Sequence, residues 1–288
     1  MKKQTLEQYV RAAHTKQTAD NYLYVISNFL SIHPDALKFQ YMDLVQYFDQ
    51  LTIRYPKVAT RTRMLAAIKK YYDFLLHTGR RIDHPCRKLI IKRKKTAIQT
   101  QDLFSMNELQ LLYTRPNRYK NLDVRDRVLF SFLLQQALSS HELAELNITN
   151  IDLDKGEVHI KASAKISGRI LPLDVSQIAL LIRYLNETRP AMIKAKTSKL
   201  IISKAGGGMS VDSIHAVFEP LRMLFPGRTM NPERIRMSVI SYWLNDRKMP
   251  VEQVMELSGL KWASSVMQYK KIDIAEQSKL INRFHPLR

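Results

Sequence analysis

Residues 229–271 have the sequence TMNPERIRMSVISYWLNDRKMPVEQVMELSGLKWASSVMQYKK, and this stretch decides how the chain is interpreted. Asn231 and Pro232 are suited to the N-cap and first turn of a helix that carries Arg236. Tyr269 follows near the end of the stretch, between lysines. In a strongly basic chain, a tyrosine near a helix-borne arginine suggests phosphate chemistry. The alternative is a packed aromatic side chain with cations on the surface.

The charge of the chain is large and unevenly distributed. Of 288 residues, 46 are Lys or Arg and 26 are Asp or Glu, which gives a formal net charge of +20. Residues 54–95 alone hold 14 Lys and Arg against two Asp. A concentrated positive field attracts polyanions, of which double-stranded DNA is one, so we expect an anionic partner. An anionic membrane fits less well, because these cations are interleaved with a core-forming helix pattern.

The composition also argues against several classes of protein. With 45% hydrophobic residues, the chain can bury a globular core. No apolar run approaches the ~18 residues of a membrane span, and the start has no signal-peptide core. We therefore expect no membrane partner and a cytoplasmic protein, nucleoid-associated when bound to DNA. The single cysteine, Cys86, excludes an intrachain disulfide and a cysteine-based zinc cluster.

The first 90 residues have the pattern of a small helical domain. Apolar residues recur at helical spacing from about residue 15 to 30, and again over 41–55 and 58–77. Gly79 is suited to the C-cap of the third helix. We therefore predict a helical DNA-binding domain over residues 1–90.

A basic linker is expected over residues 91–104. This segment lacks periodicity and carries four consecutive cations at 92–95, so we interpret it as a linker that lies on an anion. An ordinary solvated linker is the alternative. Further cations are expected on the outer face of the helix over 58–77. The residues predicted to contact DNA are Arg61, Lys69, Lys70, Lys92, Arg93, Lys94 and Lys95.

A second domain is predicted over residues 105–288. Ser105 and Glu108 have the spacing of a capping box, which marks a new helix. The segments 157–161 and 169–173 alternate like two strands of a hairpin. The fold class is therefore mainly α with a small β-sheet. Further helices are expected over 125–137, 176–186, 211–224, 251–257 and 274–284, with a short strand over 200–202.

Four segments then resemble the motifs of one family, in order. Residues 136–143, QALSSHEL, match a Thr-Gly-Leu-Arg-x-Ser-Glu-Leu turn, with Ser139 at the arginine. Lys165, or Lys161 with a one-residue gap, matches a hairpin lysine. The His-x-x-Arg motif falls on Glu233 and Arg236. A Gly-His or Gly-Trp pair falls on Gly259 and Leu260, with Trp262 two residues later, and the final tyrosine is Tyr269. The chain thereby resembles the tyrosine recombinase or phage integrase family, with a helical core-binding domain followed by a mixed α+β catalytic domain.

The resemblance implies a reaction and three roles. In this family a tyrosine attacks a DNA phosphodiester, forms a 3'-phosphotyrosyl link, and needs neither a metal nor another cofactor. Tyr269 would be the nucleophile, Arg236 part of the anion clamp, and Lys165 the general acid. The family's last helix couples protomers in a homotetramer on two DNA sites; packing on its own domain is the alternative for residues 274–284.

Three positions depart from the family pattern, at Ser139, Glu233 and Leu260. Serine has neither the charge nor the fork of a guanidinium, and an ionised Glu233 would repel a phosphate. Glu233 could instead pair with Arg234 or be protonated; His141, Arg234 or Lys261 could compensate. Two functions therefore compete. One is a site-specific recombinase or integrase of a mobile element; the other is a catalytically degenerate DNA-binding protein with an architectural or regulatory role.

Overall fold

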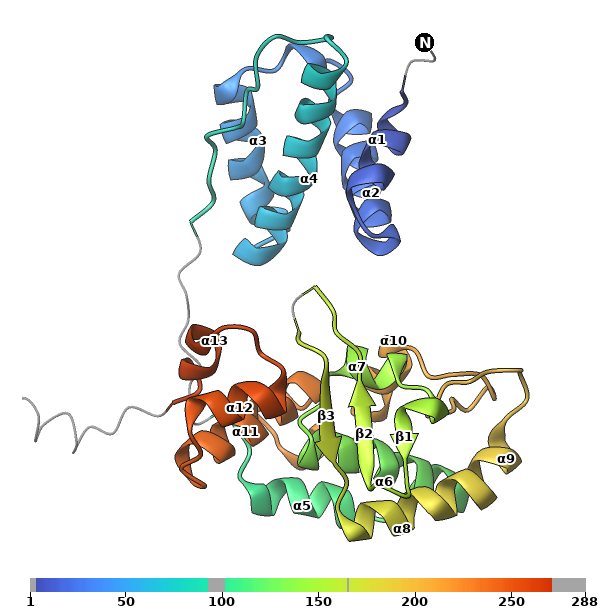
Figure 1. Cartoon of the computed structure of the whole chain (residues 1–288). Helices are drawn as coiled ribbons and strands as arrows, with labels where there is room; N and C mark the ends of the chain where they lie inside the picture. Colours follow the sequence, from blue (N-terminus) through green and yellow to red (C-terminus); the bar gives the residue numbers. More distant parts are fainter. Residues whose placement is uncertain (1–3, 93–101, 165, 271–288) are drawn as a thin grey trace, which may run out of the picture. The chain divides into compact units, whose positions relative to one another are not determined.

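The computed structural model describes residues 4–92, 102–164 and 166–270. Contacts between residues divide the chain into two compact units, Met1–Thr96 and Ala97–Arg288. Both units are built mainly from helices, and the one sheet among the described residues belongs to the second unit (Figure 1). The predicted fold class, mainly α with a small β-sheet, is thus confirmed.

The N-terminal unit consists of four helices, α1 (Leu6–Ala13), α2 (Lys16–Ile32), α3 (Tyr41–Arg54) and α4 (Val58–His77). Helix α4 contacts each of the other three, because its apolar face is the longest. It begins and ends at the predicted residues. Helix α1 was not predicted; it begins at a capping box between Thr5 and Gln8. The core includes Ile26, Phe29, Leu44, Ile68, Tyr72 and the free Cys86, whose thiol pKa burial raises to about 12.

Helix α6 (Lys120–Gln135) forms the centre of the C-terminal unit. Nine of its residues are buried, and it contacts α5 (Met106–Thr114), α8 (Val175–Arg183) and α11 (Pro232–Asn245). As predicted, α5 begins at the Ser105 capping box. Helix α6 starts at Lys120, earlier than the predicted 125, and its second turn contributes Val124 to the core.

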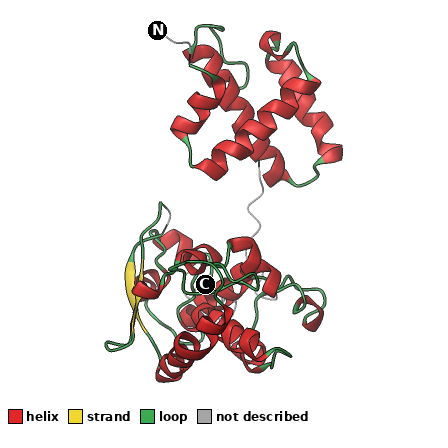
Figure 2. Cartoon of the chain, turned by 90° about the vertical axis from the view of Figure 1, so that its right-hand side faces the viewer, coloured by secondary structure: helices red, strands yellow, loops and turns green. Residues whose placement is uncertain are grey.

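The sheet has three antiparallel strands in the order β1 (Ile151–Asp152), β2 (Glu157–Ile160) and β3 (Arg169–Pro172). Figure 2 shows these strands at one edge of their unit, with helices making up most of the rest. The predicted hairpin is confirmed, whereas β1 was not predicted. The predicted strand over 200–202 is wrong: this segment forms one isolated bridge, from Ile202 to Gly208, in place of a ladder.

The remaining elements connect the sheet to the C-terminal helices. Helix α8 continues through a π-helical turn, Tyr184–Thr188. The helix predicted over 211–224 ends early, because Pro220 has no N–H to continue it; a short 3₁₀ turn, Arg222–Leu224, follows. The helix predicted over 274–284 lies outside the described residues. The other helices are α7 (Ser140–Glu145), α9 (Arg189–Met192), α10 (Val211–Val217), α12 (Val251–Ser258) and α13 (Ala263–Met267).

Candidate active site

Arg236 lies on the buried face of α11, a helix capped as predicted by the side chain of Asn231. Its guanidinium is 4% exposed. Nη1 donates to the carbonyl of Ala137, and Nη2 donates to the carbonyl of Ser258 at 2.7 Å. Burial lowers the pKa of Arg236, although an arginine stays charged at neutral pH. The guanidinium is therefore held by the backbone of two segments that are distant in sequence.

Ala137 is the second residue of the first motif and has a left-handed φ of 48°. The family turn has glycine at this position, and alanine adopts the same conformation here at a cost of about 1–2 kcal/mol. This turn brings the Ala137 carbonyl to Arg236 and places the following residues, from Ser139, at the start of α7. The left-handed conformation of Ala137 thus helps to position the guanidinium of Arg236.

Ser139 is the N-cap of α7. Its hydroxyl accepts from the N–H of Glu142 at 3.3 Å and donates to Glu142 Oε2 at 2.8 Å, while its own N–H donates to the same oxygen at 2.8 Å. This is a complete capping box. The hydroxyl proton of Ser139 is therefore engaged within the protein and is not directed at a phosphate.

Glu142 is the carboxylate that joins the elements around the site. Its side chain is 8% exposed, with Arg169 Nη1 at 2.5 Å from Oε1 and Arg236 Nη1 at 3.5 Å from Oε2. Burial alone would raise the pKa of Glu142, but the charges of Arg169 and Arg236 outweigh it and lower the pKa. Glu142 is therefore an ionised group between two guanidinium groups.

Arg169 begins β3 and points toward this carboxylate. Besides Glu142, its guanidinium donates from Nε to the carbonyl of Leu257 at 2.9 Å. Gly259 lies directly against it, since a Cβ at that position would be 2.5 Å from Nη1. Nη2 is buried without a hydrogen-bond partner. The sequence argument gave this arginine no role.

Tyr269 directly follows α13 and is 8% exposed. Its carbonyl accepts from Asn245 Nδ2 at 2.9 Å and from Ser241 Oγ at 3.3 Å, which ties it to α11. Burial raises the pKa of the Tyr269 hydroxyl, Glu233 raises it further, and Arg236 opposes this shift. The charges of Glu233 and Arg236 therefore both act on the Tyr269 hydroxyl.

The other replaced positions are placed differently. Glu233 is exposed in the first turn of α11. Arg234, which could have paired with it, instead has Asp102 at 3.5 Å. Leu260 forms an isolated bridge with Ile166 of the hairpin loop. None of these three side chains approaches Glu142 in the way that Arg169 does.

The predicted hairpin lysine, Lys165, lies outside the described residues. Around it, Lys261 Nζ donates to the carbonyls of Ser163 and Ala164 at 3.1 Å each. Lys261 thus fastens the loop that carries Lys165, which gives it a role within the protein. The alternative, Lys161, is exposed, as is His141.

The predicted DNA-contacting cations on α4 are each engaged within the N-terminal unit. Arg61 donates to Thr52 Oγ1 at 2.7 Å, Lys69 donates to the carbonyl of Arg87 at 2.9 Å, and Lys70 lies 5.0 Å from the ring centroid of Tyr9. All three are only half-exposed, because α4 packs on three helices. Lys92 is exposed; Arg93, Lys94 and Lys95 lie outside the described residues.

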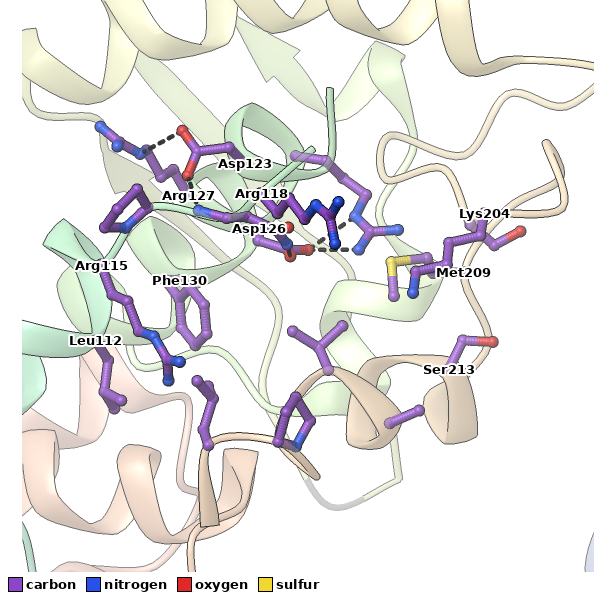
Figure 3. A pocket seen from close by; sticks show the side chains of 18 of the residues that line it. Leu112, Arg115, Arg118, Asp123, Asp126, Arg127, Phe130, Lys204, Met209 and Ser213 are labelled. Carbon is purple, nitrogen blue, oxygen red and sulfur yellow. Dashed lines mark hydrogen bonds and ion pairs between the residues drawn. The ribbon is translucent and has the colours of Figure 1, made fainter. Parts of the chain in front are cut away.

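A pocket of about 570 Å³ lies elsewhere in the C-terminal unit, between the start of α6 and α10. Figure 3 shows Asp126, Phe130 and Met209 at this pocket. Arg125, which also lines it, donates from Nη2 to Asp126 Oδ1 at 2.6 Å. Tyr269 and Arg236 do not line this pocket, so it is separate from the site above. Over the described ranges, no helix could cross a membrane. Nor do the acidic, histidine and cysteine side chains described here form a cluster of three able to hold a metal ion.

A helical bundle with a small sheet, and a buried tyrosine beside a helix-borne arginine, define the class of the tyrosine-type DNA strand transferases. The model of the Phage integrase family matches residues 103–276, more than half of the chain, and the chain belongs to this family. It is 23% identical over 226 residues to tyrosine recombinase XerD of Staphylococcus epidermidis, covering 78% of this chain and 75% of the relative.

Two solved structures share the fold. The Tn1549 transposon integrase in complex with circular intermediate DNA has a TM-score of 0.71 at 11% identity, covering 97% of this chain and 99% of that chain. A lambda integrase dimer bound to a COC' core site has a TM-score of 0.70 at 14% identity, covering 93% of this chain and 79% of that chain. At these identities the likeness supports the fold alone.

Two features of the site had signals in the sequence that were not used. Ser139 and Glu142 have the Ser-x-x-Glu spacing of a capping box, the same spacing that correctly marked Ser105 and Glu108. In β3, Arg169 and Leu171 are buried while the residues after each are exposed. The alternation of the strand therefore places Arg169 on the inward face, where a charged side chain needs a partner.

Proposed function

We propose that this chain is a site-specific DNA recombinase that cuts and rejoins DNA through a 3'-phosphotyrosyl link at Tyr269. The observation that carries the proposal is that the Tyr269 carbonyl is bonded to Ser241 and Asn245 of α11, the helix that carries Arg236, in a unit matched by the Phage integrase family. Its relative XerD is a tyrosine recombinase, and the Tn1549 and lambda integrases that share its fold are bound to DNA. The biological setting we propose is integration, excision, inversion or transposition of a mobile element.

The reaction exchanges one phosphodiester for another. The Tyr269 oxygen forms a bond to phosphorus, its proton passes to a base, and the bond to the 5'-oxygen breaks. Lys165 would donate a proton to that leaving oxygen, and Arg236 would stabilise the charge on the nonbridging oxygens. Because the pKa of Tyr269 is raised, its hydroxyl is protonated at neutral pH. A base is therefore needed at the moment of attack.

We propose that exposed cations of the N-terminal unit contact the DNA backbone. Lys57 and Arg63 are exposed at the start of α4, and Arg54 is exposed at the end of α3, where its guanidinium lies 5.6 Å from the ring centroid of Tyr55. Phosphate contacts of this kind position a protein without specifying a sequence, and they make affinity fall steeply with salt. Cutting and exchanging two DNA sites requires more than one protomer, so we also propose a homotetramer on two sites.

The experiment uses the full chain and a trapped intermediate. Binding sites are first selected from a random pool of duplex DNA at low salt. Each recovered site is then made with a nick beside candidate scissile positions, so that the cut fragment diffuses away and the covalent complex accumulates. We expect a protein–DNA adduct that survives denaturing electrophoresis with the wild type and disappears with Tyr269→Phe.

A matched control is Tyr242→Phe, which removes a hydroxyl from a half-buried tyrosine on α11. We expect it to form the adduct as the wild type does. If no recovered site gives an adduct, the recombinase proposal is refuted. The protein would then be the degenerate DNA-binding alternative, which the capped Ser139 and exposed Glu233 would suit.

A further inference from the structure

We propose that Arg169 supplies the second guanidinium at the scissile phosphate, in place of the arginine that Ser139 replaces. The inference rests on the proposed function and names a further residue of the same site. It follows from three observations about the described residues: the engagement of Ser139, the position of Arg169 beside Arg236, and an unsatisfied donor on Arg169.

The first observation removes Ser139 as a phosphate donor. Its hydroxyl proton and its N–H both go to Glu142 Oε2 at 2.8 Å. To reach a phosphate, the hydroxyl would have to leave the cap, at a cost of about 1 kcal/mol. The position in the first motif that normally provides charge therefore provides helix capping instead.

The second observation places another guanidinium at the same carboxylate. Arg169 Nη1 contacts Glu142 Oε1 and Arg236 Nη1 approaches Oε2, so one carboxylate lies between two cations. The two arginines come from different elements, β3 and α11. Both are almost fully buried, at 4% and 5% side-chain exposure. Arg169, Arg236 and Glu142 together carry a net charge of about +1, and the exposed carboxylate of Glu233 also acts on Arg236.

The third observation is the donor itself. Arg169 Nη2 is buried with no hydrogen-bond partner, although a buried unpaired donor on a charged group is costly. Its neighbours Nε and Nη1 are both satisfied, by Leu257 and Glu142. A phosphate oxygen would satisfy Nη2. Gly259 lies against this guanidinium, and its carbonyl accepts from the N–H of Ser167 at 2.9 Å. The segments around Gly259 and Ser167 must therefore move apart for a phosphate to reach Nη2.

The test separates a charge-stabilising role from a structural one. Arg169→Lys keeps the positive charge that faces Glu142 but loses the second fork of the guanidinium. It is assayed on two versions of a trapping substrate. One has the natural phosphodiester, and the other has a methylphosphonate at the scissile position, which replaces a nonbridging oxygen by methyl and so removes the negative charge.

We expect Arg169→Lys to cleave the natural substrate roughly 10²-fold more slowly than the wild type, the usual cost of one preorganised donor. On the methylphosphonate the same variant should come within about 10-fold of the wild type, because little charge remains to stabilise. The folded fraction of Arg169→Ala should likewise be slowed more on the natural substrate than on the methylphosphonate. Thermal unfolding of each variant establishes that fraction.

Arg125→Lys is the matched control. Arg125 is as deeply buried as Arg169, is paired with Asp126, and lines the separate pocket of Figure 3. The loss of cleavage rate in Arg125→Lys, relative to the wild type, should be the same on both substrates. Equal deficits of Arg169→Lys on the two substrates, or no deficit on either, would overturn the proposal. If the wild type forms an adduct with neither substrate, it is the proposed function that fails, and this inference with it.

Discussion

Replacing Ser139 by alanine distinguishes a helix cap from a catalytic group. The change removes one N-cap hydrogen bond and one hydroxyl donor to ionised Glu142, at 3.3 and 2.8 Å. Loss of such a cap costs about 1 kcal/mol, and loss of a hydrogen bond to a charged group adds to it. We therefore expect the free energy of unfolding of the C-terminal unit to fall by about 1–2 kcal/mol.

The assay is unfolding in urea, monitored by the fluorescence of the tryptophans. Both tryptophans of the chain, Trp243 and Trp262, belong to the C-terminal unit, so the signal reports that unit. Ser105→Ala is a closely matched control. Ser105 makes the same three bonds with Glu108, at 2.8, 3.1 and 3.3 Å, at the start of α5.

The same variants are then tested for adduct formation on the trapping substrate. A cap residue that only orients Glu142 should lose less than about 10-fold in cleavage rate, whereas a lost phosphate donor costs about 10²- to 10³-fold. The reasoning is refuted if Ser139→Ala loses 100-fold or more while its unfolding free energy matches that of the wild type. Ser105→Ala should lose stability and keep its cleavage rate.

Three further predictions concern pH, backbone conformation and DNA binding. The pKa of Glu142 is lowered below 4.5 in the folded state. The contribution of Glu142 to stability is therefore complete above that value and is lost as pH falls through the folded pKa. Glu142→Gln should reduce the pH dependence of the unfolding free energy measured between about pH 5 and pH 3. Gly259→Ala should destabilise the C-terminal unit by more than the ~1–2 kcal/mol expected of Gly227→Ala, a control with positive φ but open space around it. Equal losses for both glycines would argue against close packing on Arg169. Arg63→Ala should reduce the slope of log affinity against log salt by about 1. Lys69→Ala, which removes a bond to the Arg87 carbonyl, should lower the melting temperature and leave that slope unchanged.

The elements that could be predicted from sequence are those with local signals. Helix α4 has an apolar stripe over its whole length, and α5 and α11 have side-chain caps within three residues of their starts. The hairpin has alternation in both strands. The segment 200–202 was misjudged because its apolar residues are buried by the surrounding helices. A short apolar segment that is buried as a loop has the same sequence pattern as a buried strand, and only long-range contacts distinguish the loop from the strand.

The candidate site divides in the same way. Tyr269 and Arg236 could be matched by motif order, because the family spacing fixes both. The partners of Arg169 could not be inferred, since Glu142 is 27 residues away and Leu257 is 88 residues away in sequence. No window of sequence contains that contact. Arg61, Lys69 and Lys70 are half-exposed because α4 contacts three other helices, and their contact with DNA stays a prediction.

The two oxygens of Glu142 explain why the replacement at Ser139 and the position of Arg169 belong together. Oε2 accepts both bonds from Ser139 and faces Arg236 at 3.5 Å, whereas Oε1 is left to Arg169. Without the charge of Arg169, a single distant guanidinium would face a carboxylate whose burial raises its pKa. The charge of Arg236 alone would then offset that of Glu142, and Arg236 would stabilise a nearby phosphate less. With Arg169 on Oε1, Glu142 lies between two guanidinium groups, and Arg236 also acts on the Tyr269 hydroxyl, where its charge opposes the rise in pKa that burial causes.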